Sequence, residues 1–182
     1  MAFEHRFLKI VVTGPESSGK TAMADALAQA LETNRVPEFA RCYLTHLGRP
    51  YHRGDLKRIG AGQSAWERWY THRLPSGRNS GILVCDTDWT VLQIWEQFRF
   101  GIRSDYEWPR GYGAPVNADL YLLCAPDIPW NPDPLREHPE ARDVLFGLYE
   151  QLLKERQARF VTLRGLHEAR VETALAAIRK LL

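Results

Sequence analysis

The chain has 182 residues, of which 45% are hydrophobic and 25% charged; this composition excludes a disordered chain and suits a single domain over residues 1–182. The formal net charge of +2 excludes a general nucleic-acid coat, and no apolar run approaches the roughly 20 residues of a membrane span. The three widely separated cysteines form no CxxC pair and charged residues interrupt any N-terminal signal pattern, so we expect a cytoplasmic protein without a zinc knuckle or disulfide scaffold.

Strands and helices are predicted to alternate along the chain. Short apolar runs predict strands that are buried on both faces, and apolar residues at helical spacing predict amphipathic helices. We expect strands at 7–12, 36–39, 81–86, 118–124 and 160–163, and helices at 21–31, 62–74, 90–100, 144–154 and 168–182. This alternation predicts an α/β fold with a five-stranded parallel sheet flanked by helices, in which ligands bind at the carboxyl ends of the strands.

Three connections stand out between these elements. Residues 41–58 are predicted to form a polar connection, and residues 101–117, rich in Gly, Pro and aromatic residues, a loop. Residues 126–142 hold five of the eleven prolines, and proline fixes φ and removes a backbone N–H donor. We therefore expect an ordered, non-helical excursion there.

Residues 14–21 read Gly-Pro-Glu-Ser-Ser-Gly-Lys-Thr and match the phosphate-loop pattern G-x-x-x-x-G-K-[ST], between a predicted strand and a predicted helix. Gly14 and Gly19 let the backbone wrap around a polyphosphate without Cβ clashes. Lys20 can reach the β- and γ-phosphates, and Thr21 offers a hydroxyl to Mg²⁺. The alternative is a glycine-rich turn that only caps a helix. The predicted ATP contacts are Gly14, Glu16, Ser17, Ser18, Gly19, Lys20 and Thr21.

Asp86 ends a predicted apolar strand and is the expected partner of the phosphate loop. A carboxylate at this place can hold the Mg²⁺ shell directly or through water, together with Thr21. The alternative is a cap for the following helix, for which Thr87 and Asp88 are equally suited.

Among phosphate-loop proteins, a small-molecule kinase fits best. A GTPase would usually carry Asn-Lys-x-Asp and Asp-x-x-Gly, and neither pattern occurs in the chain. The compact length and the excursion at about 126–142 favour a kinase whose lid closes and excludes water.

Four segments, in this order, resemble the ribosylnicotinamide kinase domain of NadR-type NAD-biosynthesis proteins, a branch of the P-loop kinases. They are Gly-Pro-Glu-Ser-Ser-Gly-Lys-Thr (14–21), Pro-Glu-Phe-Ala-Arg (37–41), Cys-Asp-Thr-Asp-Trp-Thr (85–90), and the stretch 119–136 from Asp-Leu-Tyr to Pro-Leu-Arg. The first is common to many kinases, whereas the other three together are more specific. The resemblance implies a P-loop NTPase fold and phosphorylation by ATP of the 5′-hydroxyl of nicotinamide riboside, giving the mononucleotide.

The chain departs from the family pattern at several places. Pro15 stands where the family often has glycine, and Cys42 where it often has an acidic residue. The first strand is predicted within the first ten residues, so we expect neither the DNA-binding nor the adenylyltransferase domain of NadR proteins. Residues 46–49, His-Leu-Gly-Arg, also lack the last histidine of an HxGH signature.

The implied reaction assigns roles to charged residues near the predicted strand ends. Glu38 is placed to bind ribose hydroxyls or to take the acceptor's proton; the alternative is a surface salt bridge to Arg41, and Asp88 is the rival base. On the lid, Arg136 is preferred for the phosphate oxygens, whereas Arg142 is interpreted as solvated. The predicted catalytic residues are Lys20, Glu38, Asp86, Asp88 and Arg136.

Aromatic residues are candidate walls for the cationic pyridinium ring, because aromatic faces attract cations. Trp66, Trp69, Tyr70 and Trp89 could serve, although aromatics at helical spacing are more often core residues. Gln63 could bind the carboxamide or cap its helix. The predicted substrate contacts are Glu38, Arg41, Gln63, Trp66, Asp88 and Trp89.

Other functions remain open at this point. The chain could phosphorylate another nucleoside or a small alcohol, and the arginines of 49–58 could serve a nucleoside monophosphate acceptor. It could also be a non-catalytic sensor of ATP or NAD. We expect a small-molecule partner and no nucleic acid or membrane, while the oligomeric state and the choice between ATP and GTP stay undetermined.

Overall fold

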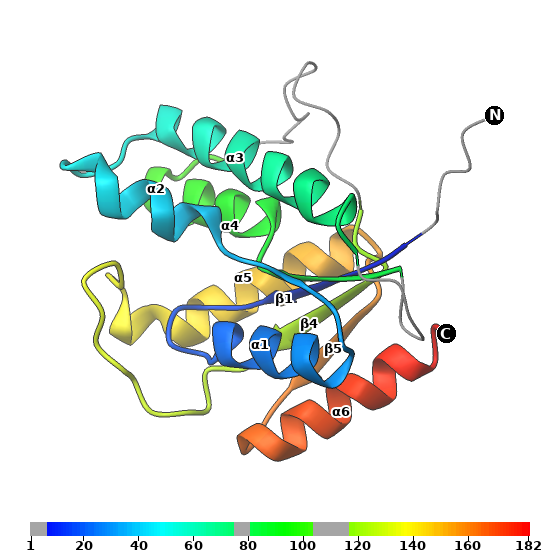
Figure 1. Ribbon diagram of the computed structural model, residues 1–182. Helices are drawn as coiled ribbons and strands as arrows, with labels where there is room; N and C mark the ends of the chain where they lie inside the picture. The colour runs from blue at the N-terminus through cyan, green and yellow to red at the C-terminus, as the bar shows by residue number, and fades with distance from the viewer. Residues whose placement is uncertain (1–6, 75–80, 104–116) are drawn as a thin grey trace.

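The computed structural model describes residues 7–74, 81–103 and 117–182 and shows an α/β fold (Figure 1). A sheet of five parallel strands lies in the described part of the chain, in the order β2-β3-β1-β4-β5. The strands are β1 (Leu8–Thr13), β2 (Arg35–Val36), β3 (Ile82–Asp86), β4 (Leu120–Cys124) and β5 (Phe160–Leu163). The predicted five-stranded parallel sheet is thereby confirmed. After β3 the chain crosses to the other side of β1, so the strand order switches beside β1, where open parallel sheets bind ligands.

Helices cover both faces of the sheet (Figure 1). One face carries α1 (Lys20–Ala30) and α6 (His167–Arg179), and the other carries α2 (Phe39–Leu47), α3 (Arg53–Thr71), α4 (Trp89–Phe100) and α5 (Arg142–Glu155). The two-residue period of β1 explains this arrangement: Ile10 and Val12 pack toward α1 and α6, whereas Val11 packs toward the other four helices. All three side chains are fully buried.

The segment after β1 and α1 is more helical than predicted. The expected strand at 36–39 ends at Val36, and the expected polar connection at 41–58 was wrong because it holds most of α2 and the beginning of α3. At the start of α3, His52 and Asp55 form a reciprocal capping box. Gly62 lets α2 and α3 approach closely, since a Cβ there would lie 2.2 Å from the ring of Phe39.

The two other predicted connections differ in outcome. Most of 101–117 lies outside the described residues. The expected non-helical excursion at 126–142 is confirmed for residues 126–138. Beyond them the chain is helical, because Pro139–Ala141 form the 3-10 helix η1 and Arg142 begins α5. We refer to residues 126–138 as the lid segment.

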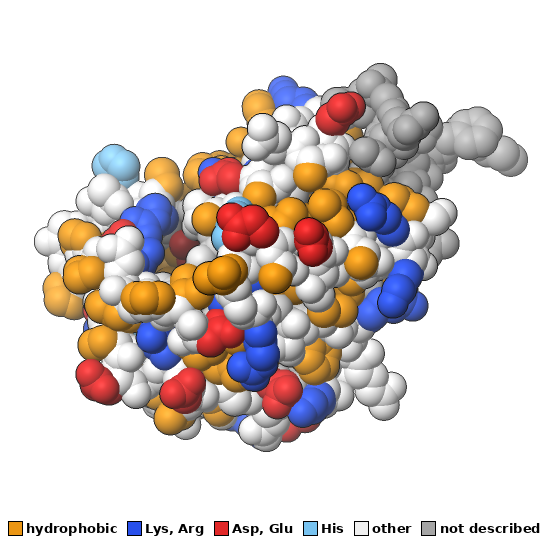
Figure 2. Space-filling view, turned by 90° about the horizontal axis from the view of Figure 1, so that it is seen from below, with side chains coloured by type: hydrophobic (Ala, Val, Ile, Leu, Met, Phe, Trp, Pro, Cys, Tyr) orange, Lys and Arg blue, Asp and Glu red, His pale blue; other side chains and the backbone are white. Residues whose placement is uncertain are grey.

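Figure 2 shows the face of the molecule that lies at the bottom of Figure 1. Acidic and basic side chains are interspersed there with apolar groups. None of the helices that the structure describes is both long enough and apolar enough to span a membrane.

Candidate active site

The phosphate loop, residues 14–19, joins β1 to α1 at the carboxyl edge of the sheet. Gly14 has a φ of +137°, and a Cβ there would lie 2.6 Å from the carbonyl oxygen of Cys124, so the loop requires glycine at this position. The ammonium group of Lys20 donates to the carbonyl oxygen of Pro15 at 2.7 Å. A cavity of about 340 Å³, the phosphate cavity, opens along the loop. Both the loop and the lysine are thus where the motif predicted them.

The side chains of the loop are engaged within the protein. Ser18 Oγ donates to the Pro15 carbonyl at 2.8 Å, and Ser17 Oγ accepts a hydrogen bond from Asn131 N at 2.8 Å. Glu16 Oε2 accepts from two backbone N–H groups of the lid segment. Glu16, Ser17 and Ser18 line the cavity while their side chains have partners in the protein, which leaves their backbone N–H groups to serve phosphate as in other phosphate loops.

Asp86 and Thr21 meet as the sequence predicted. Thr21 Oγ1 donates to Asp86 Oδ2 at 2.7 Å, and Arg35 from β2 reaches the same oxygen at 3.3 Å. The other carboxylate oxygen, Asp86 Oδ1, is buried and has no partner among the described residues. Burial raises the pKa of Asp86, while Thr21, Lys20 and Arg35 oppose this shift. A buried carboxylate oxygen without a partner beside a threonine hydroxyl suits a Mg²⁺ ion that phosphates and water would further ligate.

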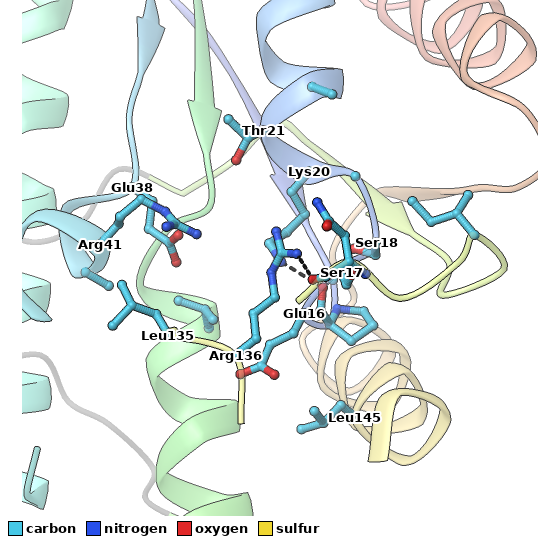
Figure 3. Close-up of a pocket in the computed structure, with 18 of the residues that line it drawn as sticks. Glu16, Ser17, Ser18, Lys20, Thr21, Glu38, Arg41, Leu135, Arg136 and Leu145 are labelled. Carbon is cyan, nitrogen blue, oxygen red and sulfur yellow. Dashed lines mark hydrogen bonds between the residues drawn. The ribbon is translucent and has the colours of Figure 1, made fainter. Parts of the chain in front are cut away.

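Glu38 lies across the phosphate cavity from the loop, immediately before α2 (Figure 3). Its carboxylate forms no hydrogen bond within the described ranges. Burial raises the pKa of Glu38, whereas the positive charges of Lys20 and Arg41 lower it. The alternative of a Glu38–Arg41 salt bridge is not observed, because Arg41 Nη1 pairs with Asp133 of the lid segment at 3.0 Å.

The lid segment contributes one arginine to the cavity, and an arginine at the start of α5 attaches the segment to the loop. Arg136 lines the cavity between the loop and Glu38 (Figure 3). Arg142 is not simply solvated, because its Nη1 donates to the carbonyl oxygens of Ser17 at 3.3 Å and Ile128 at 2.9 Å. The lid segment is thereby tied to the phosphate loop.

A second cavity of about 110 Å³, the aromatic compartment, adjoins the first and shares Glu16, Leu44, Trp95, Leu135 and Leu145 with it. Aromatic side chains from three parts of the chain line it: Tyr51, Trp95, Phe98 and His138. The Arg99 guanidinium lies 4.0 Å from the Tyr51 ring centre and pairs with Glu137 at 2.7 Å.

Five predicted site residues do not line either cavity. One is Asp86, which contacts the phosphate cavity only through Thr21; the others are Asp88, Trp89, Gln63 and Trp66. Asp88 is fully engaged at the start of α4, where Oδ1 accepts from Thr90 N at 2.8 Å and Oδ2 accepts from the Tyr121 hydroxyl at 3.0 Å. The guanidinium carbon of Arg156 lies over the Trp89 ring, 4.1 Å from the ring centre. The helix-capping alternative therefore describes Asp88, and Asp86 alone remains at the phosphate loop.

The other two hold α2 against α3. Gln63 Oε1 accepts from Phe39 N at 2.8 Å, and the Trp66 ring packs edge-on against the Phe39 ring at 4.9 Å. Both thus support the backbone next to Glu38 without reaching the cavity. Trp69, at 50% exposure, lies on the surface and contacts Tyr70 and Arg73.

Sequence patterns did not single out several residues of the site. Trp95 and Tyr149 line the phosphate cavity from α4 and α5, and Tyr51 lines the aromatic compartment. Arg170, at 3% exposure, donates to the Ser18 carbonyl at 2.8 Å and the Ala125 carbonyl at 3.1 Å, and so joins the loop to the end of β4. The apolar periodicity of 90–100 could have indicated Trp95, but no local signal marks Arg170.

The sequence matches the AAA domain family (AAA_28) over residues 9–170. The chain belongs to this family. No curated protein matches the sequence.

Solved structures share the fold. A NadR protein in complex with NR matches with a TM-score of 0.75 and 21% identity, over 96% of this chain and 51% of that chain. A NadR protein in complex with NAD and AMP-PNP matches with a TM-score of 0.68 and 20% identity, over 96% of this chain and 49% of that chain. The thymidylate kinase from Ehrlichia chaffeensis matches with a TM-score of 0.60 and 16% identity, over 94% of this chain and 99% of that chain.

At these identities the matches establish the P-loop NTPase fold, and the resemblance to NadR-type proteins is confirmed at the level of the fold. The chain spans about half the length of the NadR chains.

Proposed function

We propose that the protein transfers the γ-phosphoryl group of ATP to a nucleoside hydroxyl, and that its acceptor is the 5′-hydroxyl of nicotinamide riboside. The observation that carries this proposal is a carboxylate without a hydrogen-bond partner in the described ranges, Glu38, which faces Lys20 across a cavity that continues into an aromatic compartment. The bound NR of the NadR structure and the kinases that share the fold support the same reaction.

The donor half of the reaction needs charge neutralisation more than covalent chemistry. Lys20, now hydrogen-bonded to Pro15 O, is within reach of phosphates that would lie along the loop. Thr21 and Asp86 would hold Mg²⁺, and the ion would supply positive charge that offsets the negative charge of the phosphates. Arg136 adds positive charge on the lid side of the same cavity.

Glu38 serves the acceptor half. Its carboxylate can accept a hydrogen bond from the attacking hydroxyl and take its proton as the new P–O bond forms. Burial raises the pKa of Glu38 toward the basicity useful for this transfer, whereas the positive charges of Lys20 and Arg41 oppose the shift. The lid segment, tied to the loop through Ser17 and Arg142, would exclude water that would otherwise compete with the acceptor.

The aromatic compartment suits a positively charged ring. Tyr51 and Trp95 lie with their ring centres 5.8 Å apart, and the carboxylates of Glu16 and Glu137 reach the same compartment. Aromatic faces and carboxylates both attract cations, and the pyridinium ring of nicotinamide riboside is one. Arg99 already uses this preference when it stacks on Tyr51.

A nucleoside monophosphate acceptor is disfavoured because the arginines of 49–58 are bound elsewhere. Arg49 forks onto the buried carboxylate of Asp55 at 2.8 and 3.0 Å, and Arg58 joins it at 3.0 Å. Arg53 pairs with the buried Glu96 at 2.5 Å. These guanidinium groups support α2, α3 and α4 and would have to leave buried carboxylates unpaired to bind a phosphate.

An acceptor panel with Mg·ATP tests the proposal. Nicotinamide riboside, its neutral dihydro form, thymidine, deoxyadenosine and thymidine monophosphate are supplied separately, and products are identified by mass spectrometry. We expect the highest kcat/KM for nicotinamide riboside and a drop of about tenfold for the dihydro form, which loses the cation–π attraction. Preferred phosphorylation of another acceptor would contradict the specific assignment, and nucleotide binding without any turnover would indicate a sensor.

A further inference from the structure

Glu16 belongs to the phosphate loop in sequence, but its carboxylate binds the lid segment. Oε2 accepts hydrogen bonds from Glu137 N at 3.0 Å and from His138 N at 3.1 Å. Figure 3 shows the side chain extending from the loop toward the side on which Arg136 and Leu145 lie. Hydrogen bonds to a carboxylate are among the stronger ones in proteins, and here two converge on one oxygen.

The two residues whose backbone Glu16 binds form part of the wall of the aromatic compartment. Glu137 and His138 both line it, and Glu137 pairs there with Arg99 at 2.7 Å. The His138 ring packs edge-on against Phe98 at 4.9 Å. One carboxylate of the donor loop therefore sets the position of residues on the acceptor side.

The other contacts between loop and lid act at a different place. Ser17 binds Asn131 N, and Arg142 binds Ser17 O and Ile128 O, so these bonds attach the beginning of the lid segment. The Glu16 bonds attach its end at Glu137 and His138, beyond Asn131 along the chain. Loss of Glu16 would release the compartment wall while the lid stays attached at Asn131.

We propose that Glu16 is a positioning residue for the acceptor and that it does not bind the nucleotide through its side chain. The identity of the acceptor rests on the proposed function, but the hydrogen bonds to the lid do not. The carboxylate fixes the backbone of Glu137 and His138. It thereby sets the width of the compartment in which the acceptor's ring would lie next to the phosphate loop.

Two variants of Glu16 and one control test this role. Glu16→Ala removes both acceptor bonds, and Glu16→Gln keeps a side-chain oxygen that can accept them. Glu140→Ala removes an exposed carboxylate two residues beyond His138 and serves as the control. Hydrogen–deuterium exchange of the peptide containing Glu137 and His138, Mg·ATP binding by calorimetry, and steady-state kinetics with nicotinamide riboside are measured for each protein.

For Glu16→Ala we expect about tenfold faster exchange of these two amides and about tenfold higher acceptor KM, with kcat and the Kd of Mg·ATP within about twofold of wild type. Glu16→Gln should recover most of both losses, and Glu140→Ala should match wild type in all three measurements.

Unchanged exchange in Glu16→Ala, or a tenfold loss of Mg·ATP affinity with an unchanged acceptor KM, would overturn the proposal. A wild-type protein that phosphorylates no acceptor would overturn the proposed function and the acceptor role together, and exchange alone would then show whether the lid bonds exist.

Discussion

Asp86 and Asp88 are two residues apart, yet one lies in a region that leaves a carboxylate oxygen without a partner in the described ranges and the other in a region that bonds both of its oxygens. Asp86 faces the phosphate loop and keeps one buried oxygen without a partner among the described residues. Asp88 lies in a buried polar cluster that we define as Lys9, Glu67, Asp88 and Tyr121, where both of its oxygens are bonded and Lys9 pairs with Glu67 at 2.6 Å. Because a buried polar atom without a partner is costly, it persists where a ligand can supply the partner. The same residue type thus serves the site in one place and stability in the other.

The largest stability effect should come from breaking the Lys9–Glu67 pair. Glu67→Gln removes the carboxylate charge that pairs with the fully buried ammonium of Lys9, and we expect a loss of about 3–5 kcal/mol in the free energy of unfolding. Urea denaturation measures this loss. The double variant Lys9→Met/Glu67→Leu removes both charges and should recover most of it, so a double variant as unstable as the single one would contradict the pairing.

The pH dependence of this pair has a defined sign. Burial alone would lower the pKa of Lys9, but Glu67 and neighbouring acidic groups raise it from 10.5 to about 12. A raised pKa in the folded state stabilises the protein below the unfolded value, and the contribution is lost as the pH rises through about 12. The stability that the charge of Lys9 contributes should therefore be constant from neutral pH to about pH 10.

Replacing each aspartate by asparagine should have different effects on the Mg²⁺ requirement and on stability. Asp86→Asn should raise the Mg²⁺ concentration for half-maximal turnover about tenfold and leave the melting temperature unchanged or higher, since burial makes the ionised form of Asp86 costly. Asp88→Asn should leave the Mg²⁺ curve unchanged and cost about 1–3 kcal/mol of stability, because the cap of α4 and the Tyr121 bond are weakened. Equal metal curves for both variants would contradict the comparison.

The sequence could predict those features of the fold and the site that depend on residues close together in the chain. The loop from Gly14 to Thr21 lies within eight consecutive residues, and the strand that presents Asp86 is a continuous apolar run, so motif and periodicity were sufficient. The polar stretch 41–58 was wrongly assigned, since its helices are held by tertiary ion pairs such as Arg53–Glu96, which have no local pattern.

Which aromatic residue faces a ligand also depends on packing between elements. Trp66 and Trp95 both sit at helical spacing in amphipathic helices, but α3 turns Trp66 onto Phe39 and α4 turns Trp95 into the cavity. The partner of Glu16 lies more than 120 residues away in the chain, so its role could not be deduced from the motif that contains it.

A smaller effect should appear in the pH profile of turnover. In the proposed reaction the ionised form of Glu38 is the active one, and burial raises the pKa of Glu38, so we expect the acid limb of kcat at a higher pH than for an ordinary glutamate. Arg41 lowers the pKa of Glu38, so Arg41→Gln should move the limb to higher pH at saturating acceptor. Arg35→Gln acts on Asp86 and serves as the comparison. An acid limb that Arg41→Gln leaves in place would remove Glu38 as the base.

Calorimetric titration of ATP into the protein, with and without Mg²⁺, tests the central claim that the phosphate loop, Lys20 and Asp86 form a site for a magnesium nucleotide. The account requires one binding event per chain that is strengthened by Mg²⁺ and weakened about a hundredfold by Lys20→Met, while this variant still unfolds cooperatively. Absence of ATP binding in the wild-type protein, or equal affinity in the folded Lys20→Met variant, would contradict it.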